Sequence, residues 1–125
     1  MNVDLMEAGR APARAGMRME VRWGAGRARM RVTGELDAAT SPRLRRCLSE
    51  LAELGAHDFA LDLSGVTFID CAGLGALVSA KKRMRSVGGD VRVVAASRNV
   101  RRVLTLTGFA RAFGLDVAGE RVGAP

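Results

Sequence analysis

The amino-acid sequence predicts a single α/β domain with a small mixed β-sheet, an opening hairpin and three to four flanking helices. Near the N-terminus, two segments of alternating apolar and polar residues are separated by Gly24-Ala25-Gly26, a pattern typical of a tight hairpin. Strand-like and helix-like segments then alternate along the chain, which favours parallel strands joined by right-handed crossovers. With 125 residues, the chain can build one hydrophobic core without a metal or a disulfide.

The hairpin is expected to open the folded domain, which we place at residues 18–118. Residues 1–17 are rich in Gly, Ala, Pro and Arg without apolar periodicity, so we expect a disordered leader. In residues 19–23 and 28–33, apolar side chains alternate with polar ones, which predicts one buried and one exposed face. Gly34 is expected to end the hairpin and to begin a loop.

Helical signals follow this loop. Ser41 is expected to cap the first helix and Pro42 to occupy its first position, with Gly55 at its end. Residues 59–69 and 91–94 predict two further strands, and Ser97 and Gly108 bound the last helix. Residues 109–117 are expected to form a short final element, and residues 119–125 a flexible tail. The expected core consists of Leu44, Leu48, Leu51, Leu61, Leu63, Leu74, Leu77, Val78, Val93 and Leu104.

The central segment, residues 61–82, predicts a strand, a turn and a helix. Asp70 ends the apolar strand, and its carboxylate suits a helix N-cap. Small residues occupy the start of this helix, so another backbone could approach it closely. The alternative is that Gly75 packs against a neighbouring strand of the same domain.

Composition excludes several classes of protein. The net charge of +7 is carried mainly by arginines scattered from Arg10 to Arg121, with no run of five or more basic residues and no interleaved aromatic residues, so we expect no direct nucleic-acid partner. Cys47 and Cys71 are the only cysteines, which favours a reduced, cytoplasmic protein over a disulfide scaffold. No apolar run has the length of a membrane span or a signal peptide.

The turn after Asp70 could in principle carry chemistry. Cys71 at a helix N-terminus could be a reactive thiolate, but a phosphatase-type loop needs Arg six positions later, where Leu77 stands. The only histidine, His57, precedes the strand, so a Cys–His pair would need an unusual fold. No dinucleotide fingerprint, phosphate-binding lysine or metal-ligand cluster is present, so we predict no cofactor and no metal. We therefore expect a non-enzymatic protein that binds a macromolecule, and keep a Cys71-dependent enzyme as an alternative.

The segment LDLSGVTFIDCAGLGALVSAKK, together with Gly34-Glu35-Leu36-Asp37-Ala38-Ala39-Thr40 upstream, resembles the STAS domain of bacterial anti-sigma factor antagonists. The resemblance runs from about Met19 to Val117. It implies a protein that binds an anti-sigma factor, often a serine kinase, and thereby releases a sigma factor for transcription. A STAS subunit of a transporter or of a larger signalling assembly is the alternative with the same fold.

The resemblance also implies a contact surface and a site of control. In the phosphorylated branch of this family, the acceptor serine stands two places after the motif aspartate, and that position here is Ala72. The usual phosphorylation switch is therefore expected to be absent, with Ser64 and Thr67 among the nearest hydroxyls. We expect a monomer or a weak homodimer. The implied contact residues are Asp37, Asp70, Cys71, Ala72, Gly73, Leu74, Gly75 and Ala76.

Overall fold

The computed structural model describes residues 2–3 and 16–115, which form a mixed sheet and three helices. The strands follow the order β1-β2-β3-β4-β5 in the sheet. The β1–β2 and β2–β3 pairs are antiparallel, whereas β3–β4 and β4–β5 are parallel. The elements are β1 (Asn2–Val3), β2 (Met17–Gly24), β3 (Arg27–Leu36), α2 (Ser41–Glu53), β4 (Asp58–Ile69), α3 (Cys71–Arg85), β5 (Asp90–Ala96) and α4 (Arg98–Leu106). The predicted α/β class, mixed sheet and opening hairpin are confirmed.

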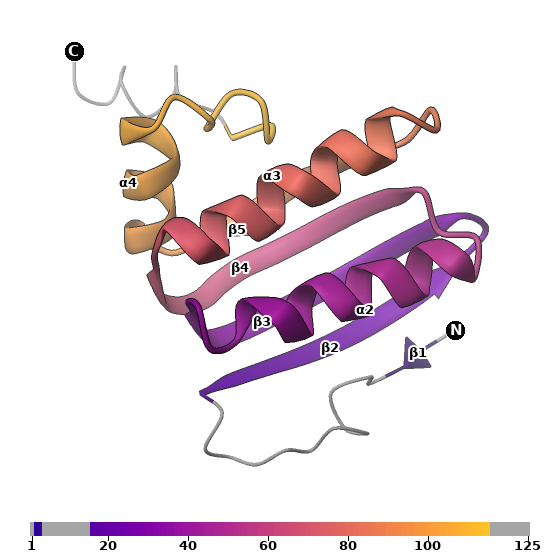
Figure 1. Ribbon diagram of the computed structural model, residues 1–125, viewed down its shortest axis with the longest axis horizontal. Helices are drawn as coiled ribbons and strands as arrows, with labels where there is room; N and C mark the ends of the chain where they lie inside the picture. Colours follow the sequence, from indigo (N-terminus) through magenta and orange to yellow (C-terminus); the bar gives the residue numbers. More distant parts are fainter. Residues whose placement is uncertain (1, 4–15, 116–125) are drawn as a thin grey trace.

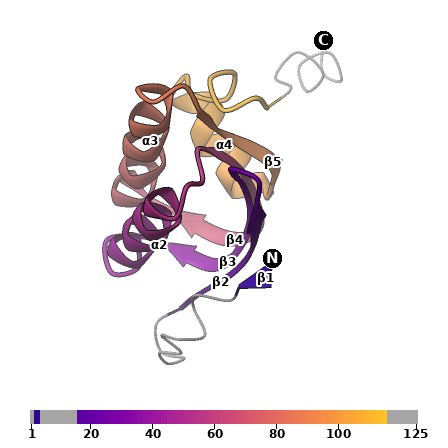
Figure 2. The same cartoon turned by 90° about the vertical axis from the view of Figure 1, so that its right-hand side faces the viewer.

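The helices are arranged asymmetrically about the sheet. Figures 1 and 2 show α2 and α3 side by side over the same face of the sheet, while α4 lies at one end beside β4 and β5. The core fills the space under α2 and α3, where Leu44, Leu61 and Leu77 are fully buried. All predicted core residues are buried except Leu74 and Val78, which are partly buried. The opposite face of the sheet carries exposed charged side chains such as Arg22, Arg29 and Arg92.

The hairpin turn has the predicted residues but the second strand is longer than predicted. Ala25 and Gly26 both have positive φ (52° and 78°), and Gly24 pairs with Arg27, as in a two-residue type I′ turn. Gly34 ends the pairing of the hairpin as predicted, because Met17↔Gly34 is the last pair between β2 and β3. The expected loop does not begin there, since Gly34 lies within β3 at φ 102°. The strand continues past Gly34 because its last residue, Leu36, pairs with β4.

The first helix starts one residue earlier than predicted. Ser41 is already helical and Thr40 is the N-cap residue, so Pro42 is the second residue of α2. Thr40 makes no side-chain bond to the helix; its hydroxyl donates to the Glu35 carbonyl at 2.8 Å. The caps predicted for α3 and α4 are confirmed, because Asp70 and Ser97 both accept bonds from backbone N–H groups of the following turn.

The expectations for the two ends of the chain fall largely outside the described residues. Of the expected leader, residues 2–3 form β1, which pairs with β2, and Met17 is the first residue of β2, so the expectation of disorder is wrong for these residues. The tail at 119–125 and Val117 of the expected final element are also outside. Residues 110–114 form turns, and the Phe113 carbonyl accepts a bond from the Val93 N–H at 2.8 Å, so this segment lies beside β5.

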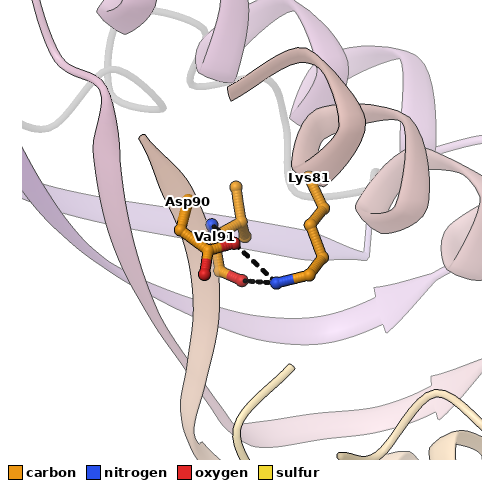
Figure 3. Close-up of polar contacts among 3 residues, drawn as sticks. All are labelled: Lys81, Asp90 and Val91. Atoms are coloured by element: carbon orange, nitrogen blue, oxygen red, sulfur yellow. Dashed lines mark hydrogen bonds and ion pairs between the residues drawn. The ribbon is translucent and has the colours of Figure 1, made fainter. Parts of the chain in front are cut away.

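An ion pair fastens α3 to the edge strand β5 (Figure 3). Lys81 Nζ donates to Asp90 Oδ1 at 2.6 Å and to the Val91 carbonyl at 3.1 Å, and it lies 5.2 Å from the centre of the Phe113 ring. Burial raises the pKa of Asp90, but hydrogen bonds from Lys81 and from the Val91 N–H outweigh it, so this pKa lies below its usual range. The ion pair thus joins α3, the helix that follows the central turn, to β5.

Candidate protein-binding site

The two loops that contain the predicted contact residues lie side by side at the end of the sheet where β3 and β4 terminate. Leu36 at the end of β3 pairs with Ile69 at the end of β4. The next peptide continues this contact, since the Asp70 N–H donates to the Leu36 carbonyl at 3.2 Å. Asp37 and Asp70 therefore follow adjacent parallel strands at equivalent positions. The fold brings the two sequence motifs together.

The carboxylate of Asp37 shapes its own loop. Asp37 Oδ1 accepts from the Ala39 N–H at 3.0 Å and from the Thr40 N–H at 3.1 Å. The Asp37 N–H donates in turn to the Thr40 hydroxyl at 2.9 Å, and Thr40 is only 2% exposed. These bonds fix the two intervening alanines, Ala38 and Ala39, at the surface. The role of Asp37 in the described structure is thus to hold the loop that leads into α2.

Asp70 organises the second loop in the same manner. Its Oδ1 accepts from the Ala72 N–H at 2.9 Å and from the Gly73 N–H at 3.1 Å. Two of the four unpaired N–H groups at the start of α3 are satisfied in this way. The negative charge also lies at the positive end of the helix dipole, and Lys82, Arg83 and Arg85 lie in the last turn. Loss of this carboxylate would therefore loosen the turn itself.

Gly73 is the point of closest approach between α3 and β3. A Cβ atom added to Gly73 would lie 2.3 Å from the Leu36 carbonyl oxygen and 2.9 Å from its Cγ. At Gly75 the nearest atom to an added Cβ is Arg45 Nη2, at 3.6 Å, which is ordinary contact. Close packing within the domain was expected as an alternative role for Gly75, but the structure gives that role to Gly73.

The structure divides the predicted contact residues into two groups. Gly73 is buried and Ala76 is 0% exposed, so the expectation that these two face a partner is wrong. Both face inward because α3 packs its first two turns against the sheet and α2. Cys71 is exposed, and the other predicted contact residues are half-buried. We use the name two-loop platform for the small residues of the two loops and of the start of α3 that keep accessible atoms: Ala38, Ala39, Cys71, Ala72 and Gly75.

An exposed aromatic side chain two residues before Asp70 was missed by sequence reasoning. Phe68 belongs to the apolar segment before Asp70, yet it is 49% exposed. The buried positions of β4 are Phe59, Leu61 and Leu63, then Val66 and Ile69, so the alternation breaks after Leu63. This irregular spacing is the signal that could have identified Phe68 as an outward-facing residue. Exposed aromatic residues often anchor protein interfaces.

The structure does not bring Cys71 and His57 together, as a Cys–His pair in the enzymatic alternative would require. Cys71 follows β4 and His57 precedes it, so the twelve residues of the strand separate them by roughly 40 Å at about 3.3 Å per residue. Among residues 2–3 and 16–115, no group of three or more His, Cys, Asp or Glu side chains could hold a metal ion. Within the same ranges, no helix has the length and apolar character needed to cross a membrane.

The hydroxyl groups nearest to Ala72 in sequence lie away from the first turn of α3. Ser64 lies on β4, where its hydroxyl donates to Asp62 Oδ1 at 2.6 Å, and the hydrogen bonds from Ser64 hold the pKa of Asp62 below its usual range. Thr67 Oγ1 donates to the Gly34 carbonyl at 3.3 Å. Ser79 lies two turns into α3. Ala72, at the second position of α3, has no group that could accept a phosphoryl group.

Comparisons with known proteins agree on one family. The family model described as the STAS domain matches residues 19–120. An anti-sigma-B factor antagonist from Bacillus subtilis is 32% identical over 89 residues, covering 71% of this chain and 81% of that protein. The crystal structure of an anti-sigma factor antagonist from Mycobacterium paratuberculosis has a TM-score of 0.70 at 28% identity, covering 82% of this chain and 87% of that chain. A sulfate transporter family protein from Wolinella succinogenes shares the fold, with a TM-score of 0.62 at 22% identity over 74% of this chain and 75% of that chain.

Proposed function

The chain belongs to the STAS domain family, and on this premise we propose that it is an anti-sigma factor antagonist, a cytoplasmic regulator without enzymatic activity. It binds an anti-sigma factor and so frees a sigma factor for transcription. The observation that carries this proposal is the pairing of Leu36 with Ile69, which joins both family motifs in one surface. The names of the more similar relatives support the choice of partner.

The two-loop platform is the contact surface in this proposal. The platform consists of three alanines, one cysteine and one glycine. Because these residues are small, a partner backbone can approach α3 and the loop after β3 closely. The carboxylates of Asp37 and Asp70 are occupied by backbone N–H groups, and they act by holding the two loops in place. Phe68, two residues before Asp70 and 49% exposed, supplies a large aromatic contact of the kind enriched in protein interfaces.

The second part of the proposal is that the platform lacks the serine switch of the phosphorylated branch. A phosphoryl group adds nearly two negative charges and three acceptor oxygens at one point. At residue 72 the helix dipole favours such a charge, so the fold tolerates it while a closely apposed partner is repelled. Ala72 offers no oxygen for the transfer. The chain consequently stays in its binding state when the kinase activity of the partner is present.

The hydroxyls at Ser64 and Thr67 are poor replacements for the missing serine. A phosphate on Ser64 would face Asp62, whose carboxylate already accepts the Ser64 hydroxyl bond at 2.6 Å, and like charges would repel. Thr67 lies on the sheet side of the turn, where its hydroxyl donates to Gly34 rather than facing the platform. We therefore expect neither residue to be modified.

A binding titration tests the proposal directly. Purified chain is titrated against a serine-kinase anti-sigma factor of the same bacterium before and after incubation with ATP, and intact mass is recorded in parallel. The wild-type chain is expected to bind equally in both cases and to remain unmodified. The Ala72→Ser variant is expected to gain one phosphate and lose binding, and Ala72→Asp to bind weakly while melting as the wild type does.

The outcomes separate the alternatives. Absence of binding to any anti-sigma factor, together with binding to a transporter or another signalling subunit, would refute the proposed partner and keep only the fold. A stoichiometric phosphate on Ser64 or Thr67 of the wild-type chain would mean that the switch has moved rather than been lost.

A further inference from the structure

The sheet face that α2 and α3 leave open carries a row of arginines. Arg22 on β2 pairs with Arg29 on β3, Arg29 with Ala60 on β4, and Ala60 with Arg92 on β5. The four residues therefore lie at one level across four strands. The three arginine side chains are exposed, and the alanine between two of them is half-buried. This level of the sheet contains no acidic residue.

The arrangement opposes stability, because like charges on directly paired positions of neighbouring strands repel. The levels on either side balance their charges. On one side Arg31 pairs in register with Glu20 and Asp62 and lies 3.6 Å from the Asp62 carboxylate; on the other side Arg27 pairs with Asp58. Among the described residues, none of the three arginines in the row forms an ion pair. Packing and folding give no reason for this row.

A hollow lies over the row. It has a volume of about 780 Å³, and its lining includes Arg22, Arg27, Arg29, Asp58, Ala60 and Arg92. Ala60 lies between Arg29 and Arg92 in this lining, where a longer side chain would take up part of the space between the two arginines. The hollow lies near the start of β4, at the end of the sheet away from the two-loop platform. It is thus separate from the proposed anti-sigma factor contact.

We propose that this arginine row is a binding site for a free linear oligophosphate, a small anion with several phosphate groups in line. Neighbouring strands lie about 4.8 Å apart, so the row from Arg22 to Arg92 spans roughly 14 Å at the backbone. Guanidinium groups are well suited to phosphate because their planar donors bind two oxygens at once. The strip is narrow: the flanking levels, each about 6.6 Å away along the strands, carry acids that repel further phosphates. A narrow linear anion fits this charge pattern better than a nucleic acid, whose phosphates would extend over the acidic levels.

Titration calorimetry with sodium triphosphate at low salt tests the inference, and a thermal melt of each variant monitors the fold. The test variant is Arg29→Gln/Arg92→Gln. The matched control is Arg98→Gln/Arg102→Gln, which removes two exposed charges from α4. Triphosphate is expected to bind the wild type and the control alike. The test variant should bind at least about tenfold more weakly, since it loses the charge-assisted hydrogen bonds of two guanidinium groups.

The melting temperature distinguishes a binding role of Arg29 and Arg92 from a structural role, because removal of structurally important arginines would lower it. Without ligand, the test variant should melt at the same temperature as the wild type or higher, because the substitution relieves like-charge repulsion. Equal loss of binding in the test variant and the control would overturn the inference in favour of general charge attraction. Tighter binding of a single-stranded oligonucleotide than of triphosphate at the same salt would overturn the assigned ligand. Absence of triphosphate binding by the wild type would overturn the site itself, and none of these results bears on the anti-sigma factor titration.

Discussion

Replacing Gly73 with alanine should destabilise the domain, although alanine is the better helix former. The added Cβ would lie 2.3 Å from the Leu36 carbonyl oxygen, well inside van der Waals contact, and both atoms belong to backbone segments. The first turn of α3 must therefore move away from the end of β3. Overpacking of this kind costs about 1–3 kcal/mol, and the helix propensity of alanine recovers at most about 1 kcal/mol. With the full gain in helix propensity subtracted, we expect a net loss of up to about 2 kcal/mol in the free energy of unfolding, together with weaker binding to the anti-sigma factor.

Gly75→Ala is the matched control on the same helix. Its Cβ would meet only Arg45 Nη2, at 3.6 Å, so the gain in helix propensity is not opposed by a clash. Urea unfolding followed by circular dichroism should show Gly75→Ala as stable as the wild type or up to about 1 kcal/mol more stable. A Gly73→Ala variant that gains stability as Gly75→Ala does would refute the close approach of α3 to β3 on which the platform geometry depends.

Three further predictions follow from buried and exposed groups. Leu77 is 0% exposed, so Leu77→Ala should cost about 2–5 kcal/mol in urea unfolding; a loss below about 0.5 kcal/mol would contradict its place in the core. The lowered pKa of Asp90 means that its ion pair with Lys81 stabilises the fold above the unfolded value of about 4, and that this contribution is lost as the pH falls through the lower folded pKa. Asp90→Asn should flatten the decline in stability between about pH 5 and 2, and an unchanged slope would exclude this role. Phe68→Ala should weaken anti-sigma factor binding by at least about tenfold without lowering the melting temperature, whereas equal losses of both would assign Phe68 to the fold.

Local chemistry is what sequence reasoning predicted well. The two positive-φ residues of the hairpin turn, the Asp70 and Ser97 caps and the glycines that end the helices all act within a few residues of the chain. Their signals depend on backbone geometry and on unpaired N–H groups, which the sequence displays directly. The course of β3 beyond Gly34 is different in kind, because it depends on pairing with β4 some thirty residues later.

Which side of α3 faces a partner also depended on tertiary structure. Small residues at the start of α3 are equally compatible with an open surface and with close packing. The distinction between Gly73 and Gly75 comes only from the position of the Leu36 carbonyl. The arginines gave a similar ambiguity: they are scattered in the sequence, but the strand register gathers Arg22, Arg29 and Arg92 at one level. Register of this kind is set by long-range pairing and by the strand irregularities, so the sequence alone does not reveal it.

The central claim is that the chain relieves inhibition by an anti-sigma factor, and transcription measures this most directly. RNA polymerase holding the sigma factor is first inhibited with the kinase-type anti-sigma factor that binds the chain, in the presence of ATP. Addition of the wild-type chain is expected to restore run-off transcription and to keep it restored over time, while Ala72→Ser restores it only transiently. Failure of the folded wild-type chain to restore transcription, even in several-fold excess over the anti-sigma factor, would contradict the proposed function.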